Sequence, residues 1–316
     1  MRFDSKTRIV VTGGAGFLGH EIVGTLRARG VEAIVPRQKQ YDLRTWEGVK
    51  ALFEDHKPEV VIHAAWNGGG IGFSREHPGL MARDNVLMAT HVIEACRQYN
   101  VAKFVGVGSV CSYPKFSPVP FREEDLWNGY PEETNAAYGL AKRMMLVLTE
   151  SFRQEYGLNG VHLLMVNLYG PRDNFDLQSG HVIPALIRKF KAAKDGGQTS
   201  VSLWGDGSPT REFVYITDAA EAVVRATESY DSSEPVNVGS GEEISIRDLA
   251  TTIARIIGYD GEMVWDKSNL NGQPRRRLDV SKAKERFGFS AQVSFSQGLQ
   301  KTIDWYLTEG RQHWER

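Results

Sequence analysis

The chain has 316 residues, of which 41% are hydrophobic and 24% are charged, with a net charge of −1. This length exceeds one average domain, so we expect a large core and two lobes, and the charge gives no electrostatic case for binding nucleic acid. The polar stretch Met1 to Lys6, and the lack of any apolar run of ~18 residues, predict a cytoplasmic protein without a signal peptide or membrane span. The two cysteines, Cys96 and Cys111, are too few for a disulfide framework. They have no paired spacing with histidines, which argues against a zinc site.

The first predicted element is a β-branched run from Arg8 to Thr12, which suits a buried parallel strand. A helical pattern follows the glycine-rich turn TGGAGFLG. In this context the turn predicts a dinucleotide site, with Gly13 for the tight turn, Gly16 for close approach of a pyrophosphate and Gly19 for packing of the helix on the strand. We expect the cofactor to contact Gly13, Gly16, Phe17, Leu18 and Gly19.

The end of the second predicted strand, Glu32 to Val35, indicates which nicotinamide cofactor binds. An NAD site normally places an acidic residue there, to bond the ribose hydroxyls. The chain instead carries Arg37 and Lys39, whose positive charges suit a 2′-phosphate, so NADP(H) is favoured with Arg37 as its ligand. The alternative is that both are solvated loop charges and that Asp42 serves the ribose.

Strands and helices then alternate through the first half of the chain. Further strands are expected over Glu59 to Ala65, Phe104 to Ser109 and Val161 to Leu168, and helices over Trp46 to His56, Gly79 to Tyr99 and Asn135 to Tyr156. This alternation predicts an α/β fold with a doubly wound parallel (Rossmann) sheet, whose ligands collect beyond the carboxyl ends of the strands. We expect His63, Ala64, Ala65, Asn85 and Ser109 at that edge.

After Tyr169 the pattern changes, with a helix expected over His181 to Ala193, a strand over Val201 to Trp204 and an amphipathic helix from the cap Ser245 to Ile257. Glu212 to Tyr215, with the helix Asp218 to Ser229, is predicted to return to the sheet, and Pro235 to Gly239 is a short last strand. The later pieces are not expected to extend the parallel sheet. The predicted organisation is an NADP-binding domain over 1–172 and 213–238, and a smaller C-terminal α/β substrate lobe over 173–212 and 239–316.

Tyr138 and Lys142 are the strongest candidates for chemistry. Residues four apart share a helix face, so the Lys142 ammonium is expected to lower the pKa of the Tyr138 phenol by stabilising phenolate. The same spacing is common on solvated helices, which is the alternative for an isolated pair. Together with Ser109 and the nucleotide turn, the pair predicts a tyrosine that exchanges a proton with substrate.

These motifs resemble the extended short-chain dehydrogenase/reductases over nearly the whole chain. Four segments resemble the GDP-L-fucose synthases within that family: GSVCSYPK from Gly108, NLYGPRDNF from Asn167, HVIPALIRKF from His181 and LWGDGSPTREF from Leu203. The resemblance implies a homodimer that binds a GDP-sugar. It also implies epimerisation of GDP-4-keto-6-deoxy-D-mannose at C3 and C5, followed by reduction at C4 with NADPH.

The resemblance also implies roles for individual residues. Cys111 is the base and His181 the acid of the epimerisation, and a thiol and an imidazole suit these tasks near neutral pH. Ser109 and Tyr138 bond the C4 oxygen, and Lys142 also holds the nicotinamide ribose. As alternatives, Cys111 is a small buried hydrophobe and His181 a helix N-terminal residue without a chemical role.

Substrate contacts are expected from cations that match the diphosphate and from a surface for guanine or sugar. The alternatives are turn capping for Asn167, a place in the core for Trp204 and a solvated face for the run of arginines that contains Arg276. The candidates are Asn167, Lys189, Trp204, Arg211 and Arg276.

Two other functions stay open. One is a related epimerase or 4-reductase acting on a different GDP-ketosugar, such as a dideoxy or heptose sugar. The other, which the intact set of reactive residues disfavours, is a dinucleotide-binding regulatory protein without turnover.

Overall fold

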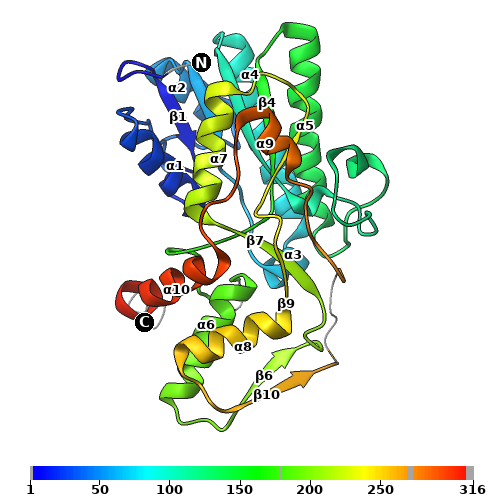
Figure 1. Ribbon diagram of the computed structural model, residues 1–316. Coiled ribbons are helices and arrows are strands. Elements are labelled where there is room, and N and C mark those ends of the chain that lie inside the picture. Colours follow the sequence, from blue (N-terminus) through cyan, green and yellow to red (C-terminus); the bar gives the residue numbers. More distant parts are fainter. Residues whose placement is uncertain (1–2, 178, 269–272, 311–316) are drawn as a thin grey trace.

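The computed structural model describes residues 3–177, 179–268 and 273–310. Figure 1 shows a central parallel sheet with helices on both faces, placed above a smaller group of helices and short strands. The sheet has five strands, all parallel, in the order β1-β2-β3-β4-β8. Their bounds are Ile9–Thr12 (β1), Val60–His63 (β2), Lys103–Ser109 (β3), Gly160–Met165 (β4) and Val236–Val238 (β8).

Alternating side chains of the buried strands hold a helical layer on each face of the sheet. Ile9 and Val11 pack toward one layer, whereas Val10 packs toward the other, as the two-residue period of a strand requires. The first layer contains α1 (Phe17–Ala28), α7 (Ile216–Ser229) and α9 (Ser281–Phe287). The second contains α2 (Trp46–His56), α4 (Pro78–Gln98) and α5 (Ala136–Tyr156).

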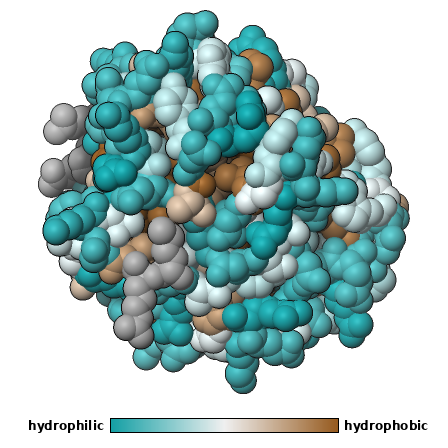
Figure 2. Space-filling model, turned by 90° about the horizontal axis from the view of Figure 1, so that it is seen from above, coloured by the Kyte–Doolittle hydropathy of each residue, from teal (hydrophilic) through white to brown (hydrophobic). Residues whose placement is uncertain are grey.

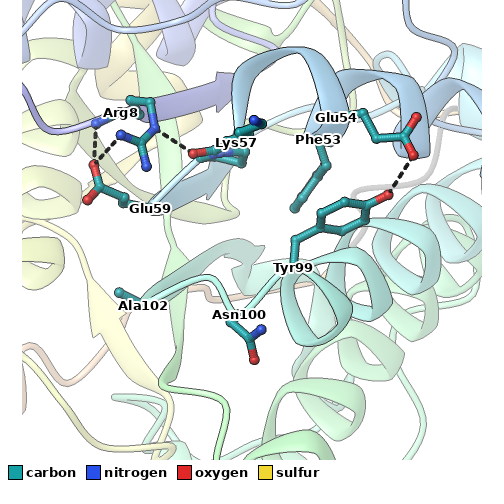
Figure 3. A pocket seen from close by; sticks show the side chains of 9 residues that line it. Arg8, Phe53, Glu54, Lys57, Glu59, Tyr99, Asn100 and Ala102 are labelled. Carbon is teal, nitrogen blue, oxygen red and sulfur yellow. Dashed lines mark hydrogen bonds and ion pairs between the residues drawn. The ribbon is translucent and has the colours of Figure 1, made fainter.

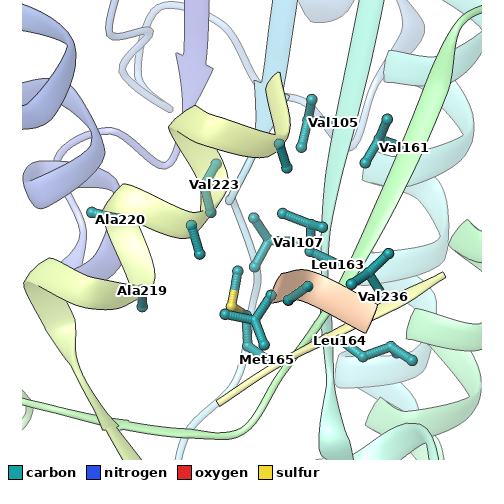
Figure 4. Packing of buried hydrophobic residues seen from close by; sticks show 14 of the residues in the cluster. Val105, Val107, Val161, Leu163, Leu164, Met165, Ala219, Ala220, Val223 and Val236 are labelled. Atoms are coloured by element: carbon teal, nitrogen blue, oxygen red, sulfur yellow. The ribbon is translucent and has the colours of Figure 1, made fainter. Parts of the chain in front are cut away.

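Helix α7 of the first layer packs directly on the sheet. Ala219 and Ala220 of α7 are fully buried, and their small side chains let the helix approach the strands closely. Figure 4 shows these alanines with Val223 beside the branched side chains of β3 and β4. This packing holds α7 against β3 and β4.

Two predicted strands differ from the structure. Glu32 to Val35 contributes only an isolated bridge between Ile34 and Val10, not a full strand. The expected single strand from Val161 is divided after Met165: the Val166 amide still donates to the Val238 carbonyl of the main sheet, and the chain then forms β5 (Asn167–Tyr169), which belongs to another sheet.

The smaller part of the molecule has two short sheets. In one, β5 is parallel to β7 (Thr210–Tyr215), which is antiparallel to β9 (Glu243–Ser245); in the other, β6 (Ser200–Trp204) is parallel to β10 (Glu262–Asp266). Their hydrophobic core includes α6 (Val182–Asp195), α8 (Ile246–Ile257), α10 (Phe295–Trp305) and the π-helical turn η3 (Tyr306–Gly310).

The helix α8 begins as its sequence predicts. The Ser245 hydroxyl accepts a hydrogen bond from the Asp248 amide at 3.0 Å, and Leu249 and Ile253 are buried on one face.

The predicted return to the main sheet needs correction at its first strand. β7 does not join that sheet; it pairs with β5 and β9. The last strand of the returning segment 213–238 does extend the main sheet, since β8 is parallel to β4. The segment around α9 also packs with the main sheet, because Phe287 and Phe289 belong to its core, although 239–316 was expected in the other lobe.

Three short helices complete the fold: α3 (Ile71–Glu76) and the 3-10 turns η1 (Val110–Ser112) and η2 (Glu123–Trp127). None of the helices that the structure describes combines the length and the apolar character that a bilayer crossing requires.

Candidate active site

The turn between β1 and α1 has the geometry of an anion site. Gly13 has a φ of 70°, and a Cβ there would lie 2.7 Å from the Ala65 amide nitrogen, so only glycine fits. A Cβ on Gly19 would collide with the Gly13 carbonyl oxygen. Helix α1 follows the N-cap Gly16 without a side-chain cap and without an acidic residue in its first turn, from Phe17 and Leu18 onward. Its free amides and positive helix end suit a diphosphate.

Residues that follow β2 lie directly against this turn. The Ala64 amide donates to the Thr12 carbonyl at 3.1 Å, and the Ala65 amide to the Thr12 hydroxyl at 3.4 Å. Asn85, nearly buried on α4, donates to the Asn67 and Met81 carbonyls at 2.7 Å each. The structure thus uses the Asn85 amide to hold the loop beyond β2, and a contact with cofactor stays a prediction.

Arg37 and Asp42, the two alternative ligands of the cofactor ribose, have different surroundings in the structure. The Arg37 side chain is exposed and makes no hydrogen bond or ion pair with any described residue, so it is available to a ligand. The Asp42 carboxylate is occupied, because Arg44 donates to it at 2.9 and 2.6 Å, and these bonds lower the pKa of Asp42. This geometry favours Arg37 over Asp42.

Ser109, Cys111, Tyr138 and Lys142 come together at the carboxyl end of β3. The Ser109 hydroxyl accepts from the Cys111 amide at 3.2 Å and also forms a hydrogen bond with Tyr138. Lys142, one turn along α5, donates to the Val107 carbonyl at 2.8 Å, and its Nζ lies 5.8 Å from the centre of the Tyr138 ring. The sequence prediction that these residues share a site is consistent with this arrangement.

The expected pKa of Tyr138 is wrong in direction for the protein without ligands. Burial and the nearby Cys111 thiol raise the pKa of the phenol, and the hydrogen bond with Ser109 opposes them only in part. Lys142 makes its hydrogen bond to the Val107 carbonyl instead, and burial lowers its own pKa to about 8.

Cys111 faces two guanidinium groups. Arg276 is 8% exposed; it donates to the Cys111 sulfur at 3.6 Å and twice to the Gln273 side-chain oxygen at 3.2 Å. Burial and the neighbouring Arg276 lower the pKa of Arg211 to about 10. Arg276 is therefore no solvated surface charge, and the two arginines form a cationic region beside the thiol that suits a diphosphate.

The remaining substrate candidates lie on the smaller part of the molecule. The Lys189 ammonium lies 5.8 Å from the centre of the Trp204 ring, and Trp204 is 68% exposed. Trp204 is thus no core residue, which removes that alternative. The Asn167 amide donates to the Glu212 carbonyl at 2.7 Å and so links β5 to β7; this bond is long-range and is not the local turn cap considered as its alternative.

His181 is the N-cap residue of α6, and its imidazole is half-exposed. Its Nδ1 lies 3.4 Å from a carboxylate oxygen of Asp173. Although half of the ring surface is exposed, the protein atoms around it remove part of its hydration, which acts to lower the pKa of His181; the hydrogen bond and charge of Asp173 outweigh this effect and raise the pKa. Sequence reasoning missed Asp173, although it lies eight residues before His181 within the segment NLYGPRDNF.

Two further histidines lie near Lys142: His63, which was expected at this edge of the sheet without a chemical role, and His162, which the sequence did not single out. His63 and His162 share the level of Gly106 on neighbouring strands, and both are fully buried. His63 bonds the Thr12 hydroxyl at 2.8 Å, whereas both ring nitrogens of His162 lack a partner among the described residues. Burial, with the Lys142 charge adding to it, lowers the pKa of both to about 3.

A separate pocket lies at the opposite edge of the main sheet, lined by the starts of β2 and β3 and the ends of α2 and α4 (Figure 3). Arg8 pairs with Glu59, and the Tyr99 hydroxyl donates to Glu54, so these groups bind each other. Seen from above in the orientation of Figure 1, mostly hydrophilic side chains cover the molecule (Figure 2). Within the residues described, no group of His, Cys, Asp and Glu side chains could hold a metal ion.

The main sheet is parallel, and its first strand leads through a glycine turn into a helix, which is the framework of dinucleotide-binding enzymes. Ser109, Tyr138 and Lys142 lie at the carboxyl edge of this sheet. The chain belongs to the NAD dependent epimerase/dehydratase family, whose model matches residues 9–239.

The chain is similar to enzymes that act on GDP-sugars. It is 38% identical to GDP-L-fucose synthase from Sinorhizobium fredii (95% of this chain, 96% of that protein) and 37% to GDP-L-fucose synthase 1 from Arabidopsis thaliana (96% and 94%). Its structure resembles a GDP-L-fucose synthetase from Naegleria fowleri bound to NADP, with a TM-score of 0.89 and 29% identity over 100% of this chain and 98% of that one. It also resembles a GDP-mannoheptose C4 reductase from Campylobacter jejuni with NADP bound, with a TM-score of 0.88 and 28% identity over 97% and 100%.

Proposed function

We propose that this protein is an NADP(H)-dependent nucleotide-sugar enzyme of the GDP-L-fucose synthase type. It epimerises GDP-4-keto-6-deoxy-D-mannose at C3 and C5 and then reduces the C4 ketone. Support comes from relatives of that name at 37 and 38% identity, which align over nearly the whole chain.

The cofactor would be held at the glycine turn and by Arg37. The uncapped start of α1 suits the diphosphate, and the exposed Arg37 guanidinium suits a 2′-phosphate. Ala64, Ala65 and Asn85 would line the remainder of this site. When bound, the nicotinamide supplies the hydride for the reduction.

Cys111 and His181 would carry the epimerisation. A hydrogen next to the C4 ketone is acidic, because the electron pair left behind delocalises onto the carbonyl oxygen. The Cys111 thiolate removes this proton, and the adjacent Arg276 guanidinium stabilises the negative sulfur. His181 returns a proton to the opposite side of the carbon, which inverts its configuration.

Ser109, Tyr138 and Lys142 would serve the C4 oxygen in both reactions. The two hydroxyls donate to this oxygen while negative charge develops on it. In the reduction Tyr138 gives its proton to the oxygen, and the raised pKa of Tyr138 keeps that proton on the phenol until then. Lys142 would hold the nicotinamide ribose.

The GDP moiety would bind across the two parts of the molecule. Arg211 and Arg276 suit the diphosphate, and Lys189 with the exposed Trp204 ring offers a surface for guanine or sugar. Asn167 would contact the sugar. The NADP-binding domain would comprise 1–172 with 213–238 and the α9 segment, except that β5 and β7 pair with each other in the substrate lobe, which holds the remainder.

The observation that carries this proposal is the Cys111 thiol between Arg276 and the Ser109–Tyr138 pair. A simple 4-reductase needs the hydroxyl pair but no thiol beside it. The second candidate is a related enzyme on a dideoxy or heptose GDP-ketosugar, which the similarity to a GDP-mannoheptose C4 reductase supports.

The test is to incubate the protein with NADPH and GDP-4-keto-6-deoxy-D-mannose and to identify the product by NMR. GDP-L-fucose is the expected product. Failure to convert this sugar, with turnover of another GDP-ketosugar, would favour the second candidate.

A homodimer and a cytoplasmic location stay predictions. Leu140 and Met144 lie one turn apart on α5 and are 38% and 44% exposed, which suits an apolar contact with a second copy. Light scattering after size-exclusion chromatography should give twice the chain mass, and Met144→Lys should shift it toward the monomer.

A further inference from the structure

The contact between Asp173 and His181 links a nearly buried carboxylate to a reactive imidazole. Asp173 is 2% exposed, and its Oδ1 accepts from the Asn174 amide at 2.7 Å as well as lying 3.4 Å from the His181 Nδ1. Its Oδ2 is buried and lacks a partner among the described residues. A buried carboxylate with so few donors is costly unless a cation lies beside it. The His181 imidazole becomes that cation when it is protonated, and Asp173 raises its pKa.

The loop between the two residues is built to hold this contact. The Asn174 side chain accepts from the Asp176 amide at 3.0 Å and donates to the Ser179 hydroxyl at 3.0 Å. The Asp176 carboxylate accepts from the Ser179 amide and hydroxyl, at 2.9 Å each. Before Asp173, Arg172 has a φ of 69°, a conformation that is unfavourable for a residue with a side chain. Arg172 thus holds a disfavoured backbone conformation directly before Asp173.

We propose that Asp173 is a positioning residue that keeps His181 protonated and presents its Nε2 as the acid of the epimerisation. This inference rests on the proposed function. With Asp173 accepting from Nδ1–H, the proton that leaves is the one on Nε2. This proton forms the new C–H bond with the electron pair of the enolate. The imidazole becomes neutral and keeps its Nδ1–H, which stays hydrogen-bonded to the Asp173 carboxylate. Solvent restores the Nε2 proton and takes up the proton from the Cys111 thiol.

The charge environment agrees with this role. The Asp173 carboxylate lies 3.4 Å from the His181 Nδ1, and its hydrogen bond and charge raise the pKa of His181 against the opposing effect of desolvation. A neutral histidine would be a poor proton donor at neutral pH. Asp173 therefore extends the pH range in which the acid is ready.

Asp173→Asn tests the inference, because it preserves shape and removes the charge. In D₂O, the variant should lose inversion at C3 and C5 by roughly 10- to 10³-fold, while deuterium uptake without inversion continues, because Cys111 still acts on its own side. KM for the sugar and Kd for NADPH should change little. Asp304→Asn, in an exposed carboxylate that pairs with Gln300, is the control and should behave as wild type.

A second measurement does not depend on the sugar. The His181 imidazole is followed by NMR against pH, with His181→Gln identifying its signal, and its titration midpoint should move to lower pH in Asp173→Asn. An unchanged midpoint, or an equal loss of inversion and deuterium uptake, would overturn the inference. A shifted midpoint in a protein whose wild type neither exchanges nor inverts this sugar would leave the pair standing and refute the proposed function.

Discussion

Acid should destabilise this protein strongly, because His63 and His162 are fully buried in the main sheet. Burial, with the Lys142 charge adding to it, lowers the pKa of each to about 3. In the unfolded chain both histidines titrate near ~6.5. As the pH falls, the unfolded state takes up these protons before the folded state does. The contribution of the neutral histidines to the free energy of unfolding is therefore fully present above about pH 6.5 and is lost as the pH falls toward the folded-state pKa.

The size of the loss follows from these pKa values. Between about pH 7.5 and about pH 5.0, each histidine should remove about 2 kcal/mol from the free energy of unfolding, and the two together about 4 kcal/mol. Whole domains are stable by only ~5 to 15 kcal/mol. A loss of this size is therefore easily measured.

Urea unfolding followed by circular dichroism at both pH values is the assay. His162→Leu should lose about 2 kcal/mol less than wild type over this range, because one buried imidazole no longer takes up a proton on unfolding. Other groups titrate in the same range, so the difference between the two proteins is the quantity compared. His20→Gln, in an exposed histidine, is the control and should follow wild type. Equal losses in wild type and His162→Leu would refute the reasoning.

Three further predictions concern the reactive and cofactor residues. Arg37→Ala should raise Kd for NADPH roughly ten- to a hundredfold, as the loss of a charge-assisted contact of ~1.5 to 3 kcal/mol implies, and should leave Kd for NADH almost unchanged. Arg27 is also exposed, and Arg27→Ala is the control that should change neither Kd. Equal weakening of both cofactors would contradict a 2′-phosphate contact. Cys111→Ser should abolish epimerisation and leave NADPH binding intact, because a hydroxyl is a far weaker base than a thiol. Deuterium uptake at C3 or C5 at the wild-type rate in this variant would exclude Cys111 as the base. Tyr138→Phe should slow single-turnover hydride transfer by ~10² to 10⁴, and a drop below about tenfold, or an equal effect of the exposed Tyr156→Phe, would count against Tyr138 as the proton donor.

Local sequence determined the individual elements well. Trp46–His56 is a helix with the predicted bounds, and α8 begins at the predicted cap Ser245, because capping and helical periodicity depend on neighbours along the chain. The glycine turn is likewise local, since Gly13 needs a positive φ that other residues avoid.

Strand pairing was harder to predict, because it depends on residues far apart in the chain. Glu32 to Val35 has the composition of a strand, yet only Ile34 forms a bridge. β8 joins the main sheet, although its composition is no different from that of a strand in the smaller lobe. The hydrophobic pattern shows that a segment is buried, but the partner is chosen by packing.

The sequence by itself determined which reactive groups this protein carries and that Ser109, Tyr138 and Lys142 belong together. Only the tertiary structure decided what surrounds them. It places Arg276 beside the Cys111 thiol from 165 residues away, and it pairs Asp173 with His181. It also buries Tyr138 so that its pKa rises where spacing alone predicted a fall. The physical reason is that burial and charge act through space, and the distances that set them arise from the packing of distant segments.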